Sequence, residues 1–498
     1  MMISRRDFVR GATVASATFL SQPRVRASET GRFANPLKIP ALLDGTLGSD
    51  GKIYELRIEA GESKFLPGST TPTIGINGAY LGPTIHCRVG DRVTLRVKNT
   101  LNEPTTLHWH GLHVPARYDG GPHQVIEPGT IWEPSFEIKQ KASLCWYHSH
   151  LMGRTDEQVL RGLAGLILID DDESGSLHLP SEYGIDDIPL VIQDRRFNPD
   201  GSFDYSSSMH DTMMGYKGNV ILVNGTVDPH VVLSRQRTRL RILNGSNSRI
   251  YTLGRDDEVD LLVIGSDGSL LERLVHQPRV RLGPGERVEL LVDMQTNRAV
   301  RLMSYPDSVT GGSMGSSMMM GGMAGNTETF PIIELRAAQL ETTDLSLPER
   351  LIRLPSWTAA QAARTRVFTL DMAMMGMGGM GRRTLDGLMG INGRTMSKNR
   401  IDVEIPLGSI EIWQIRNATP LAHSFHIHDI LFRVLDRDGG PPLPQEMGLK
   451  DTVLVDSRSA VRVIAEFGDF ADPQHPYMYH CHILEHEDAG MMGQFVVV

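Results

Sequence analysis

A strand pattern that recurs three times limits the fold of this chain more than any other feature. Residues 93–99, 238–244 and 411–417 each alternate apolar and polar side chains and end in asparagine, as half-buried strands do. An Asn-Gly pair precedes each strand, and the spacing from its asparagine to the strand-ending one is 22, 20 and 25 residues: the pairs are Asn77-Gly78, Asn224-Gly225 and Asn392-Gly393. One Asn-Gly pair is a common hairpin turn, but three at similar offsets predict a triplicated β-sandwich unit.

The length of the chain agrees with three such units. Its 498 residues correspond to about three domains of ordinary size. A polar, acidic stretch at residues 170–176 and a second join near residues 340–355 divide it. We therefore expect an all-β fold with domains at residues 28–172, 180–340 and 350–498. Two stretches rich in Met and Gly, residues 313–325 and 371–381, have neither a strand nor a helix period and are predicted to be insertions.

The first 27 residues have the pattern of an export signal. Ser4-Arg5-Arg6-Asp7-Phe8 is a twin-arginine motif, an apolar run follows it, and residues 25–27 offer a cleavage site. A chance arginine pair is the alternative, but the three features occur in the expected order. The twin-arginine route carries folded proteins. The signal therefore predicts a cofactor-containing enzyme of the bacterial periplasm.

Composition excludes several classes of partner. The formal net charge of -9 argues against nucleic acid, and after the signal no apolar run is long enough to span a bilayer. We expect a monomer. Three cysteines are too few for a disulfide scaffold, and Cys87 and Cys145 are predicted to be core residues.

Ten of the eighteen histidines fall in four short clusters. Imidazole and thiolate are copper ligands, and two histidines with one cysteine and a weak axial methionine define a blue-copper site. In this chain that set is His423, Cys481 and His486, with Met491 in the axial position. The other eight histidines form four His-x-His pairs, which are His108 and His110, His148 and His150, His426 and His428, and His480 and His482.

Strand geometry separates these residues into two sites. Alternate residues of a strand share a face, so Cys481 points away from His480 and His482, and His423 points away from the pair that follows it. One metal is then held by Cys481 and His423, while eight imidazoles converge on a second site, enough for three coppers. Cys481 is bonded through the backbone to both neighbours, a short route for electrons. A lone His-x-His pair is more often a polar surface pair, but four pairs, one around a cysteine, favour copper.

These motifs resemble those of the three-domain multicopper oxidases over nearly the whole chain after the signal. The motifs are residues 108–111 (HWHG), 146–150 (WYHSH), 423–428 (HSFHIH) and 480–486 (HCHILEH). The resemblance implies three cupredoxin-like, Greek-key domains and about four coppers per chain, one type 1, one type 2 and two type 3.

The resemblance also implies a role for each ligand. His108 and His426 would bind the type 2 copper, His110, His148 and His482 one type 3 copper, and His150, His428 and His480 the other. Asp119 and Glu487 match the acidic residues that deliver protons during the reduction of dioxygen to water. Either carboxylate taken alone would be a surface charge, but both lie beside ligand loops.

The substrate is expected to be the cuprous ion, because the chain resembles periplasmic copper-efflux oxidases and is rich in methionine. Ten of its 24 methionines lie in the two Met-Gly stretches, and soft thioethers favour Cu(I). Residues 419–422 lack the acidic and Met residues that such oxidases carry, so Asp371, Met372 and Met375 are the candidate substrate ligands. Two alternatives remain open: a laccase-like or bilirubin-oxidase-like enzyme for a small organic reductant, and a copper-free scaffold of envelope or division complexes. Scaffolds of that kind lose ligands that this sequence keeps.

Overall fold

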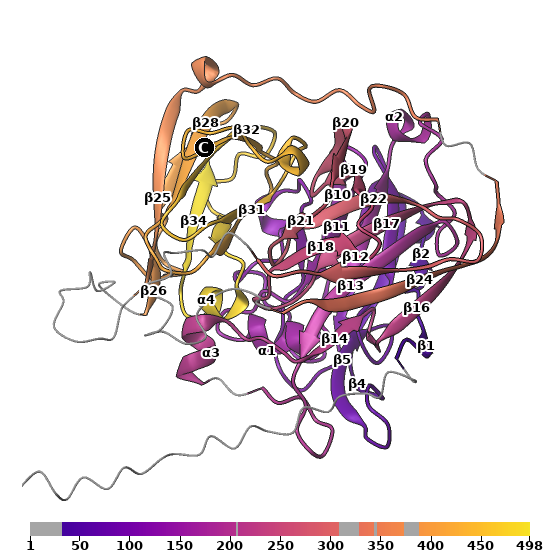
Figure 1. Ribbon diagram of the computed structural model, residues 1–498. Coiled ribbons are helices and arrows are strands. Elements are labelled where there is room, and N and C mark those ends of the chain that lie inside the picture. Colours follow the sequence, from indigo (N-terminus) through magenta and orange to yellow (C-terminus); the bar gives the residue numbers. More distant parts are fainter. Residues whose placement is uncertain (1–31, 206–207, 308–327, 343–345, 373–387) are drawn as a thin grey trace, which may run out of the picture. The chain divides into compact units, whose positions relative to one another are not determined.

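The computed structural model describes residues 32–205, 208–307, 328–342, 346–372 and 388–498. The export signal, the first Met-Gly stretch and all of the second except Asp371 and Met372 lie outside the described residues. Strands make up most of the regular structure of the described part (Figure 1), which confirms the predicted all-β fold. None of its helices is long and apolar enough to cross a membrane.

Six sheets form three pairs that follow the order of the chain. The first pair packs around one apolar core that includes Tyr54, Leu95 and Trp109. One of its sheets has the order β10 (Ser135–Glu137), β7 (Arg92–Asn99), β4 (Gly51–Ser63) and β3 (Thr46–Gly48), with β5 (Thr71–Ile76) beside β4 and β9 (Ile131–Trp132) beside β7. The other has the order β2 (Leu42–Leu43), β6 (Thr84–Arg88), β12 (Ala164–Asp170), β11 (Ser143–His148) and β8 (His108–His110).

The second pair has a separate core that includes Leu240, Leu253 and Leu290. Its first sheet has the order β1 (Asn35–Pro36), β16 (Pro229–Arg235), β24 (Phe330–Glu341), β23 (Ala299–Ser304), β18 (Tyr251–Arg255) and β21 (Val280–Leu282). Its second has the order β15 (Thr226–Val227), β14 (Val220–Val223), β13 (Asp187–Arg195), β17 (Arg237–Asn244), β22 (Arg287–Asp293), β19 (Leu261–Ser266) and β20 (Ser269–Gln277). Because β1 pairs with β16, the start of the described chain adds to this second pair, although the sequence assigned it to the first domain.

The third pair encloses a core that contains Cys481 and Met491. Its first sheet has the order β26 (Met389–Ile391), β25 (Arg364–Met372), β28 (Ser409–Asn417), β32 (Ala460–Phe467) and β30 (Arg433–Arg437). Its second has the order β27 (Val403–Ile405), β34 (Met492–Val497), β33 (Tyr477–Cys481), β29 (His423–Ile427) and β31 (Thr452–Val455). The described helices are short: α1 (Thr155–Leu160), α2 (Asp172–Gly175), α3 (Met209–Met214) and α4 (Leu484–Asp488), with 3₁₀ turns at Ala116–Tyr118, Ala359–Gln361 and Pro444–Glu446. Both α1 and α3 contact α4 (Figure 1).

The triplicated unit is a real structural repeat, because both of its asparagines make the same bonds in each copy. Asn77, Asn224 and Asn392 all have positive φ, near 50°, which asparagine tolerates better than most residues. Each accepts a backbone N–H through Oδ1, from Arg57, Val191 and Thr369 respectively, at 2.7 Å.

The strand-ending asparagines are equally regular. Asn99, Asn244 and Asn417 are buried, and each accepts the N–H of the residue two positions later while its amide donates to two or more carbonyls. Each one therefore closes the loop that leads to the next strand.

Candidate metal centre

A cysteine and two histidines meet at one end of the third sheet pair. His423 begins β29, Cys481 ends β33, and His486 lies on α4. The sulfur of Cys481 is 3.2 Å from Nδ1 of His423 and 3.8 Å from Nδ1 of His486, and the two nitrogens are 3.2 Å apart. All three side chains are fully buried. This arrangement could hold one metal ion.

Hydrogen bonds on the outer side of both rings turn their Nδ1 atoms toward the sulfur. Nε2 of His423 lies 2.7 Å from Oγ1 of Thr419, and Nε2 of His486 lies 3.3 Å from the carbonyl oxygen of Met213 on α3. Because a carbonyl can only accept, the proton of His486 is on Nε2 and its Nδ1 lone pair is free to bind a metal. Burial lowers the pKa of His486 to about 4, although the Met213 carbonyl opposes this shift.

The sulfur also lies in a closed apolar environment. Burial raises the pKa of the Cys481 thiol, so its thiolate form requires a cation beside it. Met491, which is fully buried, accepts the N–H of Cys481 through its backbone carbonyl at 3.0 Å. The predicted axial residue is therefore a direct neighbour of the cysteine.

The eight remaining histidines lie together between the first and third sheet pairs. They lie on β8 and at or just beyond the ends of β11, β29 and β33, and none is more than 1% exposed. The Nε2 atoms of His150, His428 and His480 are 3.1–3.2 Å from one another. Ligand atoms also gather within 4.8 Å in the groups His108, His110, His148 and His108, His426, His428.

Most of these rings present Nε2 to the centre of the cluster and bond outward through Nδ1. Nδ1 of His108, His148 and His426 donates to the carbonyls of Asp119, Ser149 and Asp451 at 2.7–2.9 Å. His110 is reversed, because its Nε2 is bonded outward to the Asp451 carboxylate at 2.9 Å.

Several buried ring nitrogens of the cluster have no hydrogen-bond partner among the described residues. They are Nε2 of His108, His148 and His426, Nδ1 of His110 and His150, and both nitrogens of His482. Burial lowers the pKa of His110, His148, His150, His428 and His482 well below its usual range. A buried group of neutral, unpartnered imidazoles is costly on its own and suits metal ions, so the donor set fits copper.

The two predicted acidic residues both touch the cluster. Asp119 accepts from His428 Nδ1 through Oδ2 at 2.7 Å and from His108 Nδ1 through its carbonyl. The carboxylate oxygens of Glu487 lie 3.2 Å from Nδ1 of His150 and 3.2 Å from Nδ1 of His480. Both carboxylates are buried, so neither is a surface charge.

The expectation of strand conformation through every His-x-His pair holds only for β8. β11 ends at His148, β29 at Ile427 and β33 at Cys481. Hydrogen bonds to neighbouring segments nevertheless continue one residue further, because His428 N donates to the carbonyl of Met478 and His482 N to that of Ser424. Two of the shortened strands thus keep their hydrogen bonding past their last residue.

The candidate substrate residues are less well supported. Oδ2 of Asp371 accepts the N–H of Gly393 at 2.7 Å, so it holds the third Asn-Gly turn. Met372 is half-buried against the core of the third sheet pair, and Met375 lies outside the described residues. Cys87 and Cys145 are both buried and free, as a core role requires.

Sequence reasoning missed Met213 and Asp451, which bond to His486 and His110, and Arg287, which bonds to Asp451. Asp451 lies 341 residues from His110 along the chain, and no local motif marks it. Its role becomes visible only in the folded chain, where it lies next to His110.

Family models described as multicopper oxidase match residues 57–174 and residues 365–498. The cell division protein FtsP of Escherichia coli is 34% identical, with 100% of this chain and 99% of that protein covered. The multicopper oxidase mco of Staphylococcus aureus is 33% identical, with 93% and 92% covered.

Solved structures of multicopper oxidases have the same fold. The laccase-like multi-copper oxidase CueO from Ochrobactrum sp. has a TM-score of 0.82 and 37% identity over 93% of this chain and 100% of that one. McoA from Aquifex aeolicus has a TM-score of 0.82 and 32% identity over 93% and 99%. The chain therefore belongs to the multicopper oxidase family, which consists of copper-dependent oxidoreductases that use dioxygen as acceptor.

Proposed function

We propose that this chain is a periplasmic cuprous oxidase, exported by its twin-arginine signal, that contributes to copper tolerance. Four cuprous ions each give up one electron, and one dioxygen takes up the four electrons and four protons to form two waters. When bound, a mononuclear copper and a three-copper cluster would supply this redox chemistry. The protein's own residues fix the spacing, the ligand orientation and the delivery of protons.

His423, Cys481 and His486 would hold the mononuclear copper together with Met491. The cluster would be held by His108 and His426 at the type 2 ion, by His110, His148 and His482 at one type 3 ion, and by His150, His428 and His480 at the other. Support comes from the unpartnered, buried nitrogens that face one another across the cluster. Cys481 is joined through the backbone to His480 and His482, so a few covalent bonds connect the two centres.

Asp119 and Glu487 would move protons to the cluster. Each is buried and bonded to, or within 3.2 Å of, the outer nitrogen of a histidine from a different strand. A carboxylate in that position can hold a proton next to the space between the imidazoles without entering it.

The observation that carries the choice of substrate is the position of Met213. Its carbonyl accepts the N–H of His486, and its side chain, like that of Met372, packs against the core that contains Cys481. On the same helix, Met209 is 54% exposed. Thioethers are soft ligands that favour Cu(I), so a cuprous ion bound at α3 would lie one hydrogen bond away from a ligand of the mononuclear copper.

Leucine substitutions test this choice. Met213→Leu with Met372→Leu removes two sulfurs while keeping the Met213 carbonyl and nearly the same volume. We expect the ratio of kcat/KM for Cu(I) to kcat/KM for a bulky phenol to fall about 10-fold, because only the soft ligands are lost. Met294→Leu, in the core of the second sheet pair, is the matched control. An unchanged ratio would refute the cuprous assignment in favour of a laccase-like enzyme.

A role in cell division is a second candidate, favoured by the full-length similarity to FtsP. Copper content and oxygen uptake on added Cu(I) separate the two functions. A Cys481→Ser variant adds a genetic test in the source organism. If that variant restores division to a deletion strain as well as the wild type does, the division role does not need electron transfer.

A further inference from the structure

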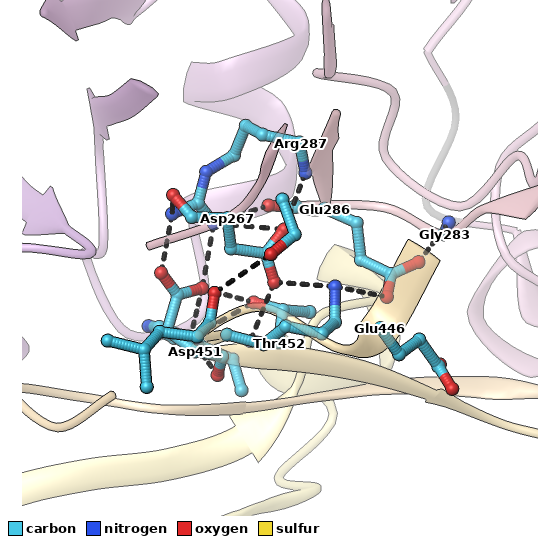
Figure 2. A network of polar contacts seen from close by, with 12 residues as sticks. Asp267, Gly283, Glu286, Arg287, Glu446, Asp451 and Thr452 are labelled. Carbon is cyan, nitrogen blue, oxygen red and sulfur yellow. Dashed lines mark hydrogen bonds and ion pairs between the residues drawn. The ribbon is translucent and has the colours of Figure 1, made fainter. Parts of the chain in front are cut away.

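Arg287 connects the three sheet pairs next to the histidine cluster. Its side chain is fully buried at the start of β22, and all five of its side-chain N–H groups have acceptors. Nε donates to the carbonyl of Leu144 at 2.9 Å, and the two terminal nitrogens donate to the carbonyls of Gly285 and Asp267 at 3.0 and 3.1 Å. The same two nitrogens also donate to the two carboxylate oxygens of Asp451, one to each, at 2.7 and 2.5 Å (Figure 2).

Most of the nearby negative charge is balanced by another cation. Asp267 lies 3.9 Å from Nη1 of Arg287 but 2.8 Å from Nζ of Lys450, and Glu286 lies 3.2 Å from the same Nζ. Lys450 thus balances the two acidic residues of the second sheet pair. A doubly bonded guanidinium fixes the plane of a carboxylate as well as its position.

Asp451 in turn holds His110. Its Oδ1 accepts from Arg287, from the Thr452 hydroxyl at 2.8 Å and from Nε2 of His110 at 2.9 Å. Because Asp451 is paired with a guanidinium, its carboxylate is ionised and can only accept hydrogen bonds. The proton of His110 is therefore on Nε2. Nδ1, which has no partner among the described residues, then carries the lone pair.

His110 is held differently from three of the other rings. His108, His148 and His426 are oriented by a backbone carbonyl at Nδ1, whereas His110 is bonded outward through Nε2 to a side chain. The next residue, Gly111, has φ of 91°, and a Cβ there would lie 2.7 Å from Arg287 and 2.9 Å from Asp451. The absence of a side chain at position 111 gives the ion pair room beside the histidine.

We propose that Asp451, fixed by Arg287, is a positioning residue that sets the tautomer of His110 and directs its Nδ1 lone pair into the copper cluster. This inference deepens the proposed function and rests on it for the identity of the metal. Arg287 belongs to the sheet pair that carries none of the candidate ligands of the mononuclear site or of the histidine cluster, so the middle third of the chain acts on the cluster through this contact.

Chelator titration of the fully loaded enzyme measures the effect. In Asp451→Ala we expect cluster copper to be held about 10- to 100-fold more weakly, while the blue absorption of the mononuclear site stays unchanged as a reference within the same molecule. Asp451→Asn keeps an oxygen that can accept from Nε2, so it should retain more cluster copper than Asp451→Ala even though both lose the ion pair. Electron paramagnetic resonance should show an uncoupled type 3 pair in the alanine variant.

A matched control removes a similar ion pair elsewhere. Asp187 is buried and doubly bonded to Arg241 in the second sheet pair, so Asp187→Asn tests the loss of stability alone. Equal weakening of cluster copper in Asp187→Asn, or equal losses in Asp451→Asn and Asp451→Ala, would show that Asp451 only stabilises the fold.

Nitrogen NMR of histidine-labelled, copper-free protein separates this inference from the proposed function. We expect the His110 signal to report a proton on Nε2 in the wild type and a mixture of tautomers in Asp451→Ala. An unchanged tautomer overturns the positioning role even if Cu(I) is oxidised. Absence of Cu(I) oxidation, with the tautomer shifted as expected, rejects only the substrate assignment.

Discussion

The second and third sheet pairs share one backbone plan but differ at two matching positions, which carry histidine only in the third pair. In the third pair, His426 and His428 follow the strand-ending Asn417 by nine and eleven residues, and His108 and His110 stand at the same offsets from Asn99. In the second pair those offsets from Asn244 fall on Leu253 and Arg255, on β18. Leu253 is part of an apolar core, and Arg255 pairs with Asp257. The fold therefore provides a repeated frame, and these two positions are part of what distinguishes a copy with candidate metal ligands from one without them.

The second pair supports the cluster without supplying a candidate ligand. Arg287 grips Asp451, and Gly285, with φ of 81°, lies so close to His482 that a Cβ there would be 2.9 Å from the ring. The copy of the unit without these histidines thus forms part of the wall around the cluster.

Loss of the cysteine in the third pair should have the largest effect. Cys481→Ser removes the thiolate that no residue of the second pair could replace, so we expect loss of the blue absorption and a fall in Cu(I)-driven oxygen uptake of at least about 1,000-fold. Most of the cluster copper should remain, because the eight histidines are intact. Copper analysis and absorption spectra check both points, and a variant that stays blue would contradict the ligand assignment.

Grafting histidines onto the second pair tests whether two positions are sufficient for a metal site. Leu253→His with Arg255→His gives this copy the residue types of the other two, but the described residues of the second pair contain no group of His, Cys, Asp or Glu spaced to hold a metal ion. We expect no additional copper and a loss of about 3 kcal/mol in unfolding free energy, because an imidazole is buried in an apolar core. Denaturant unfolding and copper analysis measure the two effects. A gain of one copper per chain would mean that the frame itself creates the site.

The strand-ending asparagines allow a like-for-like comparison of the two copies. Asn244→Ala and Asn417→Ala should each cost about 2–3 kcal/mol, because each removes several buried hydrogen bonds. Only Asn417→Ala should also shift the blue absorption, because Asn417 accepts from the Thr419 hydroxyl, which lies 2.7 Å from His423. Equal spectra for the two variants would argue against this link.

The smallest expected effect concerns how two buried or half-buried ion pairs respond to pH. His86 in the first pair lies between Asp170 and Asp44, at 2.8 and 2.6 Å, and the bond to Asp170, which exceeds the opposing effect of burial, raises the pKa of His86. The contribution of charged His86 to the free energy of unfolding is fully present below about pH 6.5. It is lost as the pH rises through the raised pKa of His86. His86→Gln should therefore cost about 0.5–1 kcal/mol in mild acid and less in base.

The corresponding ion pair in the second sheet pair should not show this dependence. Arg241 stays charged throughout this range because its interactions with Asp187 and Glu289, which outweigh burial, raise its pKa. The cost of Asp187→Asn should thus be the same in mild acid and in base. Unfolding curves at several pH values compare the two variants, and a pH-independent cost for His86→Gln would show that His86 is not charged in the fold.

The sequence predicted the parts of this protein that depend on local spacing. The three copies of the β unit were visible because each asparagine acts on neighbours within one loop, and the all-β fold followed from strand alternation. The grouping of Cys481 with His423, apart from His480 and His482, followed from the period of a strand. The predicted strands were too long at three of the four His-x-His pairs, because the end of a strand depends on where its partner strand stops pairing with it.

Contacts between distant segments were decided only by the tertiary structure. The roles of Asp451, Arg287 and Met213 depend on side chains that meet across more than 100 residues of chain, and nothing in their own neighbourhoods distinguishes them from ordinary polar or apolar residues. Asp371 was predicted to bind substrate, yet its carboxylate is bonded to the turn at Gly393. Ligand types and their spacing are encoded locally, whereas the tautomer and direction of each ring depend on partners that packing brings from elsewhere in the chain.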